Sequence, residues 1–82
     1  MLKTLVKTTE MDIDGRTFTL RFYELETSRG GKRFSCEVLL GEADRIILDD
    51  DYIASLEVSV ARLAPATLYS RVLASRAVVA AA

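Results

Sequence analysis

Apolar and polar residues alternate along the first half of the chain, and this pattern predicts β-strands. The clearest example is residues 16–27, in which Phe18, Leu20 and Phe22 are separated by mostly polar residues. A period of two places successive side chains on opposite faces of a sheet. By this pattern, together with a short apolar run at its end, strands are predicted over residues 2–13, 16–27, 32–40 and 45–48.

Two turn signals separate the first three strands. Asp14-Gly15 lies between the first two, and an Asp-Gly pair in such a place is a strong hairpin signal because glycine adopts positive φ without steric cost. Ser28-Arg29-Gly30-Gly31 supplies the second turn. Short turns join antiparallel neighbours, so we expect an antiparallel meander.

The spacing of the apolar residues changes from two to three and four after Asp49-Asp50-Asp51. Apolar residues recur at intervals of three and four from Ile53 to Leu63, which places them along one side of a helix. The three aspartates offer capping oxygens and negative charge at the start of that helix. Pro65 has no N–H group and clashes with the preceding turn, so it either kinks the helix or begins a second one.

These elements predict an α+β fold. It consists of a four-stranded antiparallel β-meander followed by a C-terminal helix that is kinked or split at Pro65. The chain has 82 residues, which is the size of one small domain. We expect that domain to cover residues 1–82, with the sheet over 1–48 and the helical layer over 49–82.

The predicted helix has more apolar surface than one face of a small sheet can bury. The excess lies after Pro65, and its residues are Leu68, Tyr69, Val72 and Leu73. Small domains that do not complete a core alone commonly dimerise, most often with two-fold symmetry. We therefore expect a homodimer that forms through the C-terminal helix, and any other protein partner would bind there too.

Composition and charge limit the partners and the cellular location that we expect. The net charge is −1, so no overall electrostatic attraction to nucleic acid or to an anionic membrane is expected. The apolar C-terminal segment carries charged residues and Pro65, which argues against a membrane-spanning helix. The first residues lack the apolar stretch of a secretory signal. These features lead us to expect a cytoplasmic protein without membrane contact.

The residues available for catalysis are few. The chain contains no histidine, which removes the commonest general base and the usual nitrogen ligand of zinc. Its single cysteine, Cys36, lies on the apolar side of a predicted strand and is expected to be a small core residue rather than a nucleophile. We therefore expect a protein that is not an enzyme and that has no cofactor.

Two acidic segments are candidate cation sites. Glu10-x-Asp12-x-Asp14-Gly15 resembles the first half of an EF-hand loop, but the twelfth position is Arg21 and strands flank the segment. An acidic hairpin turn is the favoured interpretation. Asp49-Asp50-Asp51 could hold a divalent cation through its oxygens, but helix capping explains the same residues. No metal site is predicted.

The basic residues concentrate at Arg29-Gly30-Gly31-Lys32-Arg33. This turn lacks the spacing and the following helix of a phosphate-binding P-loop, so nucleotide hydrolysis is not predicted. A solvated hairpin tip is the simpler interpretation. By alternation, however, Arg21, Tyr23 and Arg33 share the sheet face turned away from the helix. A cationic face with an aromatic ring is a minimal surface for single-stranded nucleic acid.

The layout resembles the β-β-β-β-α domains of the transcriptional-coactivator and whirly type, which bind single-stranded DNA. The resemblance covers roughly residues 16–63. It rests on Phe22-Tyr23-Glu24, the basic turn, the short strand at 45–48 and the acid-capped helix. It implies dimers paired through their helices. Carried over by position, it nominates as nucleic-acid contacts Arg21, Tyr23, Arg29, Lys32 and Arg33.

The sequence thus supports two hypotheses of different kinds. The first is a non-catalytic, homo-oligomeric protein-interaction module whose apolar helical surface binds a second copy or another protein. The alternative is a transcription-related protein that binds single-stranded nucleic acid through its basic turn and the outer face of its sheet.

Overall fold

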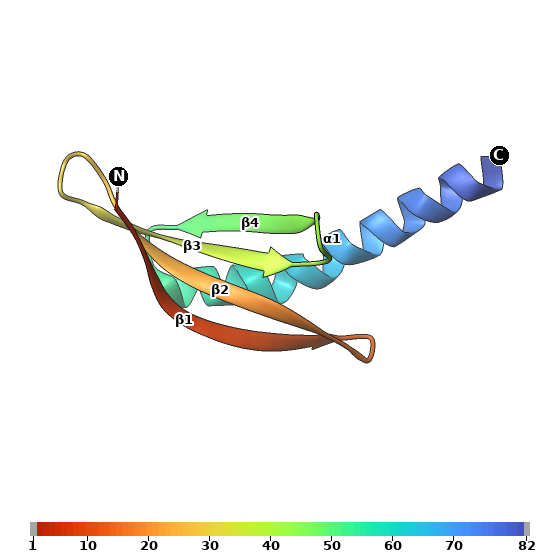
Figure 1. Ribbon diagram of the computed structural model, residues 1–82, viewed down its shortest axis with the longest axis horizontal. Coiled ribbons are helices and arrows are strands. Elements are labelled where there is room, and N and C mark those ends of the chain that lie inside the picture. Colours follow the sequence, from red (N-terminus) through yellow and green to blue (C-terminus); the bar gives the residue numbers. More distant parts are fainter. Residues whose placement is uncertain (1, 82) are drawn as a thin grey trace.

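The computed structural model, which describes the backbone of residues 2–81 and the side chains of residues 2–74, confirms the α+β fold (Figure 1). Four strands form one antiparallel sheet in the order β1-β2-β3-β4, and one helix follows. The elements are β1 (Leu2–Ile13), β2 (Arg16–Glu26), β3 (Lys32–Leu39), β4 (Arg45–Asp50) and α1 (Ile53–Ala81). Residues 1 and 82 of the predicted domain lie outside the described residues.

Both predicted hairpin turns are present. Asp14 and Gly15 have φ values of 51° and 79°, the pair of positive values that a two-residue turn between twisted strands requires. The β2–β3 turn is closed by hydrogen bonds at both ends. The Gly30 N–H donates to the Thr27 carbonyl at 3.0 Å, and the Thr27 N–H donates to the Gly31 carbonyl at 2.8 Å.

The core lies between α1 and one face of the sheet. Its buried apolar residues are Ile13, Phe18, Leu20, Phe22, Cys36, Val38, Ile46, Leu56, Val60 and Ala64. The helix contributes residues four apart, which align along one side. The predicted helical stripe ended at Leu63, and this detail is wrong. Leu63 is 37% exposed and Ala64 is fully buried, because the helix turns its 56–60–64 row toward the sheet.

The helix does not lie over the middle of the sheet. It packs mainly against β3 and β4, and a groove remains between its β1 side and the inner face of β1 and β2. One helix is about 10 Å wide, which is close to the width of two strands, so a single helix cannot cover four. Across the groove, an ion pair joins Lys7 of β1 to Glu57 of α1.

Pro65 lies inside one continuous helix rather than between two helices. Because proline has no N–H group, the carbonyl of Ala61 loses its usual partner within the helix, and Ala61 is an exposed residue. Beyond Pro65 the helix passes the ends of the strands and projects from the sheet (Figure 1). The molecule is consequently elongated, with a longest dimension of 51 Å against 24 and 21 Å.

The acidic segment before the helix differs from the prediction. Asp49 and Asp50 belong to β4, which is two residues longer than predicted. The Asp50 carboxylate accepts a hydrogen bond from the Tyr52 N–H at 3.2 Å, so it orders the residue before the helix. The first turn of α1 contains no acidic residue. Asp51 instead pairs with Arg33 of β3.

Candidate interaction surfaces

Two surfaces contain the residues that the sequence singled out. The first is the sheet face turned away from α1, called the outer sheet face below. Since Phe22 points into the core, Arg21 and Tyr23 point outward, and the strand register assigns their neighbours. The outer sheet face consists of Lys3, Leu5, Thr8, Glu10, Asp12, Thr17, Thr19, Arg21, Tyr23, Leu25, Arg33, Ser35, Glu37, Leu39, Arg45, Ile47 and Asp49.

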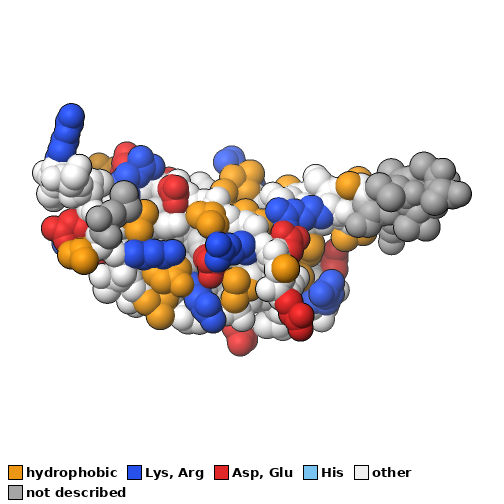
Figure 2. All heavy atoms as spheres, turned by 45° about the horizontal axis from the view of Figure 1, so that its top comes forward, with side chains coloured by type: hydrophobic (Ala, Val, Ile, Leu, Met, Phe, Trp, Pro, Cys, Tyr) orange, Lys and Arg blue, Asp and Glu red, His pale blue; other side chains and the backbone are white. Residues whose placement is uncertain are grey.

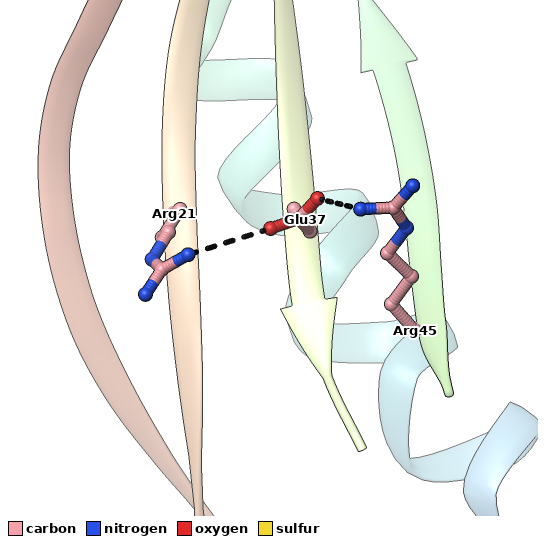
Figure 3. A network of polar contacts seen from close by, with 3 residues as sticks. All are labelled: Arg21, Glu37 and Arg45. Carbon is pink, nitrogen blue, oxygen red and sulfur yellow. Dashed lines mark hydrogen bonds and ion pairs between the residues drawn. The ribbon is translucent and has the colours of Figure 1, made fainter. Parts of the chain in front are cut away.

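A carboxylate between two arginines lies at the centre of this face (Figure 3). Glu37 of β3 is only 7% exposed, although it lies on the sheet face turned away from α1. Arg45 Nη1 donates to Glu37 Oε2 at 2.9 Å, and Arg21 Nη1 lies 3.8 Å from Glu37 Oε1. A buried carboxylate is tolerated when paired charges offset its loss of water. Glu37 therefore offsets one of the two positive charges, and its closer partner is Arg45.

The aromatic ring of Tyr23 also has a cationic neighbour. The Lys3 ammonium lies 4.2 Å from its centroid, close enough for a cation–π contact. Directly opposite Tyr23 on β1 is Leu5, which is exposed. This part of the outer sheet face combines an aromatic ring, an apolar side chain and a positive charge.

The basic turn is less cationic than its sequence suggests. The Lys32 ammonium lies 3.0 Å from the Glu24 carboxylate, and Arg33 Nε lies 3.5 Å from Asp51. The hydrogen bond to Glu24 raises the pKa of Lys32, with a further contribution from the charge of Glu24. Arg29 lies exposed at the turn. Figure 2 shows basic, acidic and apolar side chains interspersed rather than gathered by sign.

The structure thus brings together only part of the predicted nucleic-acid set. Arg21, Tyr23 and Arg33 share the outer sheet face, as alternation predicted. Lys32 has the opposite parity on β3, and it pairs with a glutamate whose side chain is on the helix side. Arg29 is at the hairpin tip, apart from both faces.

Sequence reasoning missed two cations of the outer sheet face, Lys3 and Arg45. Arg45 could have been found, because it alternates with the buried Ile46. Lys3 could not, because a bulge between Leu5 and Lys7 shifts the pairing of β1 with β2 by one residue. Without that bulge, alternation would place Lys3 on the helix side.

The second surface is on the projecting part of α1. We call Leu68, Tyr69, Val72 and Leu73 the C-terminal apolar surface. Tyr69, Val72 and Leu73 are 63%, 40% and 45% exposed, whereas Leu68 is half-buried and packs against the core. Three of the four residues predicted to be in excess therefore stay substantially exposed, and the fourth packs partly against the core.

Beside this surface is a hollow between the helix and the β1–β2 hairpin. Its lining residues are Ile13, Asp14, Arg16, Pro65, Leu68, Tyr69 and Val72, and we call it the hairpin hollow. Its walls are largely apolar, and Asp14 and Arg16 supply its charges. An ion pair between Arg71 and Asp44 ties α1 to the β3–β4 turn. The helix is thus fixed where it leaves the sheet.

The remaining candidates have structural partners. Cys36 is fully buried, and desolvation raises the pKa of its thiol from 9.0 to about 11, with the nearby Glu37 carboxylate adding to the effect. Asp12 of the acidic turn accepts a hydrogen bond from the Thr17 hydroxyl at 2.7 Å. In the described part of the chain, no three Cys, Asp or Glu side chains are grouped as metal ligands would be.

Over the residues that the structure describes, no helix has both the length and the apolar character needed to cross a membrane.

Comparisons of the chain with protein-family models, curated proteins and solved structures gave no significant match. The resemblance to the single-stranded-DNA-binding domains therefore remains a prediction.

Proposed function

We propose that this protein is a non-catalytic interaction module that associates with a second copy of itself through the C-terminal apolar surface. The observation that carries the proposal is the exposure of Tyr69, Val72 and Leu73 on adjacent turns of a helix that projects from its own sheet. Contiguous exposed apolar surface on a small domain is typical of interaction sites.

The position of these residues strengthens the argument. Leu56, Val60 and Ala64 are the fully buried core residues of α1, whereas Leu68, after Pro65, is only partly buried against the core. Keeping an apolar helical extension in water costs free energy, at roughly 25 cal/mol per Å² of apolar area. A partner that covers the extension would recover that cost.

The test is the solution mass of the native chain and of two matched variants. Val72→Asp combined with Leu73→Asp introduces charge into the C-terminal apolar surface. Val58→Asp makes the same change on α1 at an apolar residue that is 70% exposed but lies before Pro65. We expect sedimentation to give a dimer for the native chain and for Val58→Asp, and a monomer for the double variant. A native monomer at micromolar concentration would contradict the proposal.

A second candidate is binding of single-stranded nucleic acid at the outer sheet face. The observation in its favour is the grouping of Lys3, Tyr23 and Arg33 there, since bases stack on aromatic rings beside cations. The pairing of Arg21, Lys32 and Arg33 with carboxylates weakens it. A labelled single-stranded oligonucleotide should show anisotropy that falls steeply with salt. No binding at low salt would exclude this candidate.

A further inference from the structure

The hairpin hollow is continuous with the C-terminal apolar surface, because the two share Leu68, Tyr69 and Val72. The β1–β2 turn and the projecting part of α1 leave the sheet at the same end of the molecule (Figure 1). A second copy that covers the exposed side chains of this part of the helix therefore also approaches the hollow and the hairpin that forms its other wall.

The hairpin wall adds two opposite charges to this apolar surface. Asp14 in the turn and Arg16 at the start of β2 are both exposed, and neither forms an ion pair with another of the described residues. The Arg16 guanidinium carbon lies 5.3 Å from the centroid of the Phe18 ring, a core residue, which places this charge on the helix side of the sheet. One carboxylate and one guanidinium thus border the hollow, and together they carry no net charge.

A surface with one charge of each sign can be complementary to itself. In a two-fold interface, a contact from one residue to a second residue of the other copy is always matched by the reverse contact. If Asp14 meets the partner's Arg16, then Arg16 also meets the partner's Asp14, and both charges of each copy are paired. A partner whose charges are all of one sign would leave either the carboxylate or the guanidinium unpaired.

We infer that the second copy covers the hairpin hollow, and that Asp14 and Arg16 of each copy pair with the partner's Arg16 and the partner's Asp14. This inference rests on the proposed self-association and specifies how the two copies recognise each other. The apolar side chains of Tyr69 and Val72 provide contact area, and the two reciprocal ion pairs fix the orientation of the copies.

Two charge-reversed variants test this arrangement. Asp14→Lys makes both charges positive and Arg16→Glu makes both negative, so each variant alone brings like charges together across the interface. We expect the dissociation constant of each variant dimer to rise at least about tenfold at low salt. In an equimolar mixture of the two variants, opposite charges meet again, and a heterodimer with an affinity within about threefold of the native value is expected. Sedimentation measures the affinities, and native mass spectrometry identifies the heterodimer.

Two further variants separate the effect of charge at the hollow from other effects. Arg29→Glu reverses an exposed arginine in the β2–β3 turn, at the opposite end of β2, and should leave the dissociation constant within about twofold of the native value. Asp14 has a φ of 51°, which asparagine tolerates better than lysine, so Asp14→Asn removes the charge with little disturbance of the turn. It should weaken the dimer about fivefold. Circular dichroism checks that each variant is folded.

The outcomes separate this inference from the proposed function. If the native chain is a dimer and the charge-reversed variants dimerise equally well, or if mixing them restores no affinity, the inference is wrong and self-association stands. The same conclusion follows if Asp14→Asn has no larger effect than Arg29→Glu. A monomeric mass for the native chain overturns both the inference and the proposed function.

Discussion

At the scale of single residues, Cys36 shows how burial determines the reactivity of a thiol. It lies in the core between β3 and α1, and its thiol has a pKa of about 11 because the thiolate would lose its hydration. We expect a thiol reagent at pH 8 to modify the native protein far more slowly than the protein unfolded in urea. Native labelling as fast as unfolded labelling would show that Cys36 is accessible.

The same pKa predicts how stability depends on pH. In the unfolded chain the thiol loses its proton near pH 9, whereas in the folded protein it keeps the proton until about pH 11. The folded state therefore binds more protons in this window, and stability falls as the pH rises from 9 to 11, by about 1–2 kcal/mol. The Cys36→Ala variant, measured by urea unfolding over the same range, should be less stable throughout but should lose less with rising pH than the native chain.

Glu37 differs from Cys36, because it is a charged residue that is buried on the outer sheet face and not in the core. Replacing it with alanine leaves two arginines without their common partner, and we expect a loss of about 1–2 kcal/mol in the free energy of unfolding. Arg21→Ala should cost less, about 0.5 kcal/mol, because the 2.9 Å bond from Arg45 remains. Equal losses in the two variants, by urea unfolding, would mean that Glu37 is not the centre of the network.

At the scale of elements, alternation predicted β2 and β3, whereas β4 was predicted from a consecutive apolar run and is longer than that run. In β2 and β3 one face is buried and the other is not, so the pattern specifies both the element and its orientation. The register of β1 could not be predicted, because the bulge at Val6 leaves no mark in the alternation. The lateral position of α1 over β3 and β4 is a tertiary feature that the helical stripe alone does not contain.

The β1–β2 hairpin offers an element-scale test with a matched control. Gly15 has a φ of +79°, and a Cβ atom added there would meet nothing within 4 Å, so any cost of Gly15→Ala comes from the backbone alone. We expect a loss of about 1 kcal/mol. Gly41→Ala places the same atom in open space without a positive φ and should be close to neutral. Thermal melting of the two variants checks the difference, and equal melting temperatures would contradict the turn geometry.

For the candidate surfaces, the sequence predicted which apolar residues are exposed better than it predicted which charged residues are paired. The exposure of Tyr69, Val72 and Leu73 could be predicted, because these residues come after the apolar helical stripe that covers the sheet. The pairing of Arg21, Lys32 and Arg33 with carboxylates could not, because Glu37, Glu24 and Asp51 reach them across strands and turns that are distant in sequence. Ion pairing of this kind depends on register, which a charge count cannot supply.

At the scale of the whole molecule, self-association should be coupled to folding. If self-association covers the C-terminal apolar surface of each copy, the second copy binds the native state and not the unfolded one, so mass action stabilises the native state. We expect the melting temperature of the native chain to rise by about 3–5 °C for each tenfold increase in protein concentration.

The variants that test the interface also test this coupling. In Val72→Asp combined with Leu73→Asp, the melting temperature should no longer change with concentration, because no dimer remains to dissociate. Val58→Asp should keep the dependence, since Val58 lies before Pro65 and outside the C-terminal apolar surface. If Val58→Asp lost the dependence as well, the contact between copies would extend over the first half of α1, and the helices would have to be paired along their whole length instead of at their projecting ends.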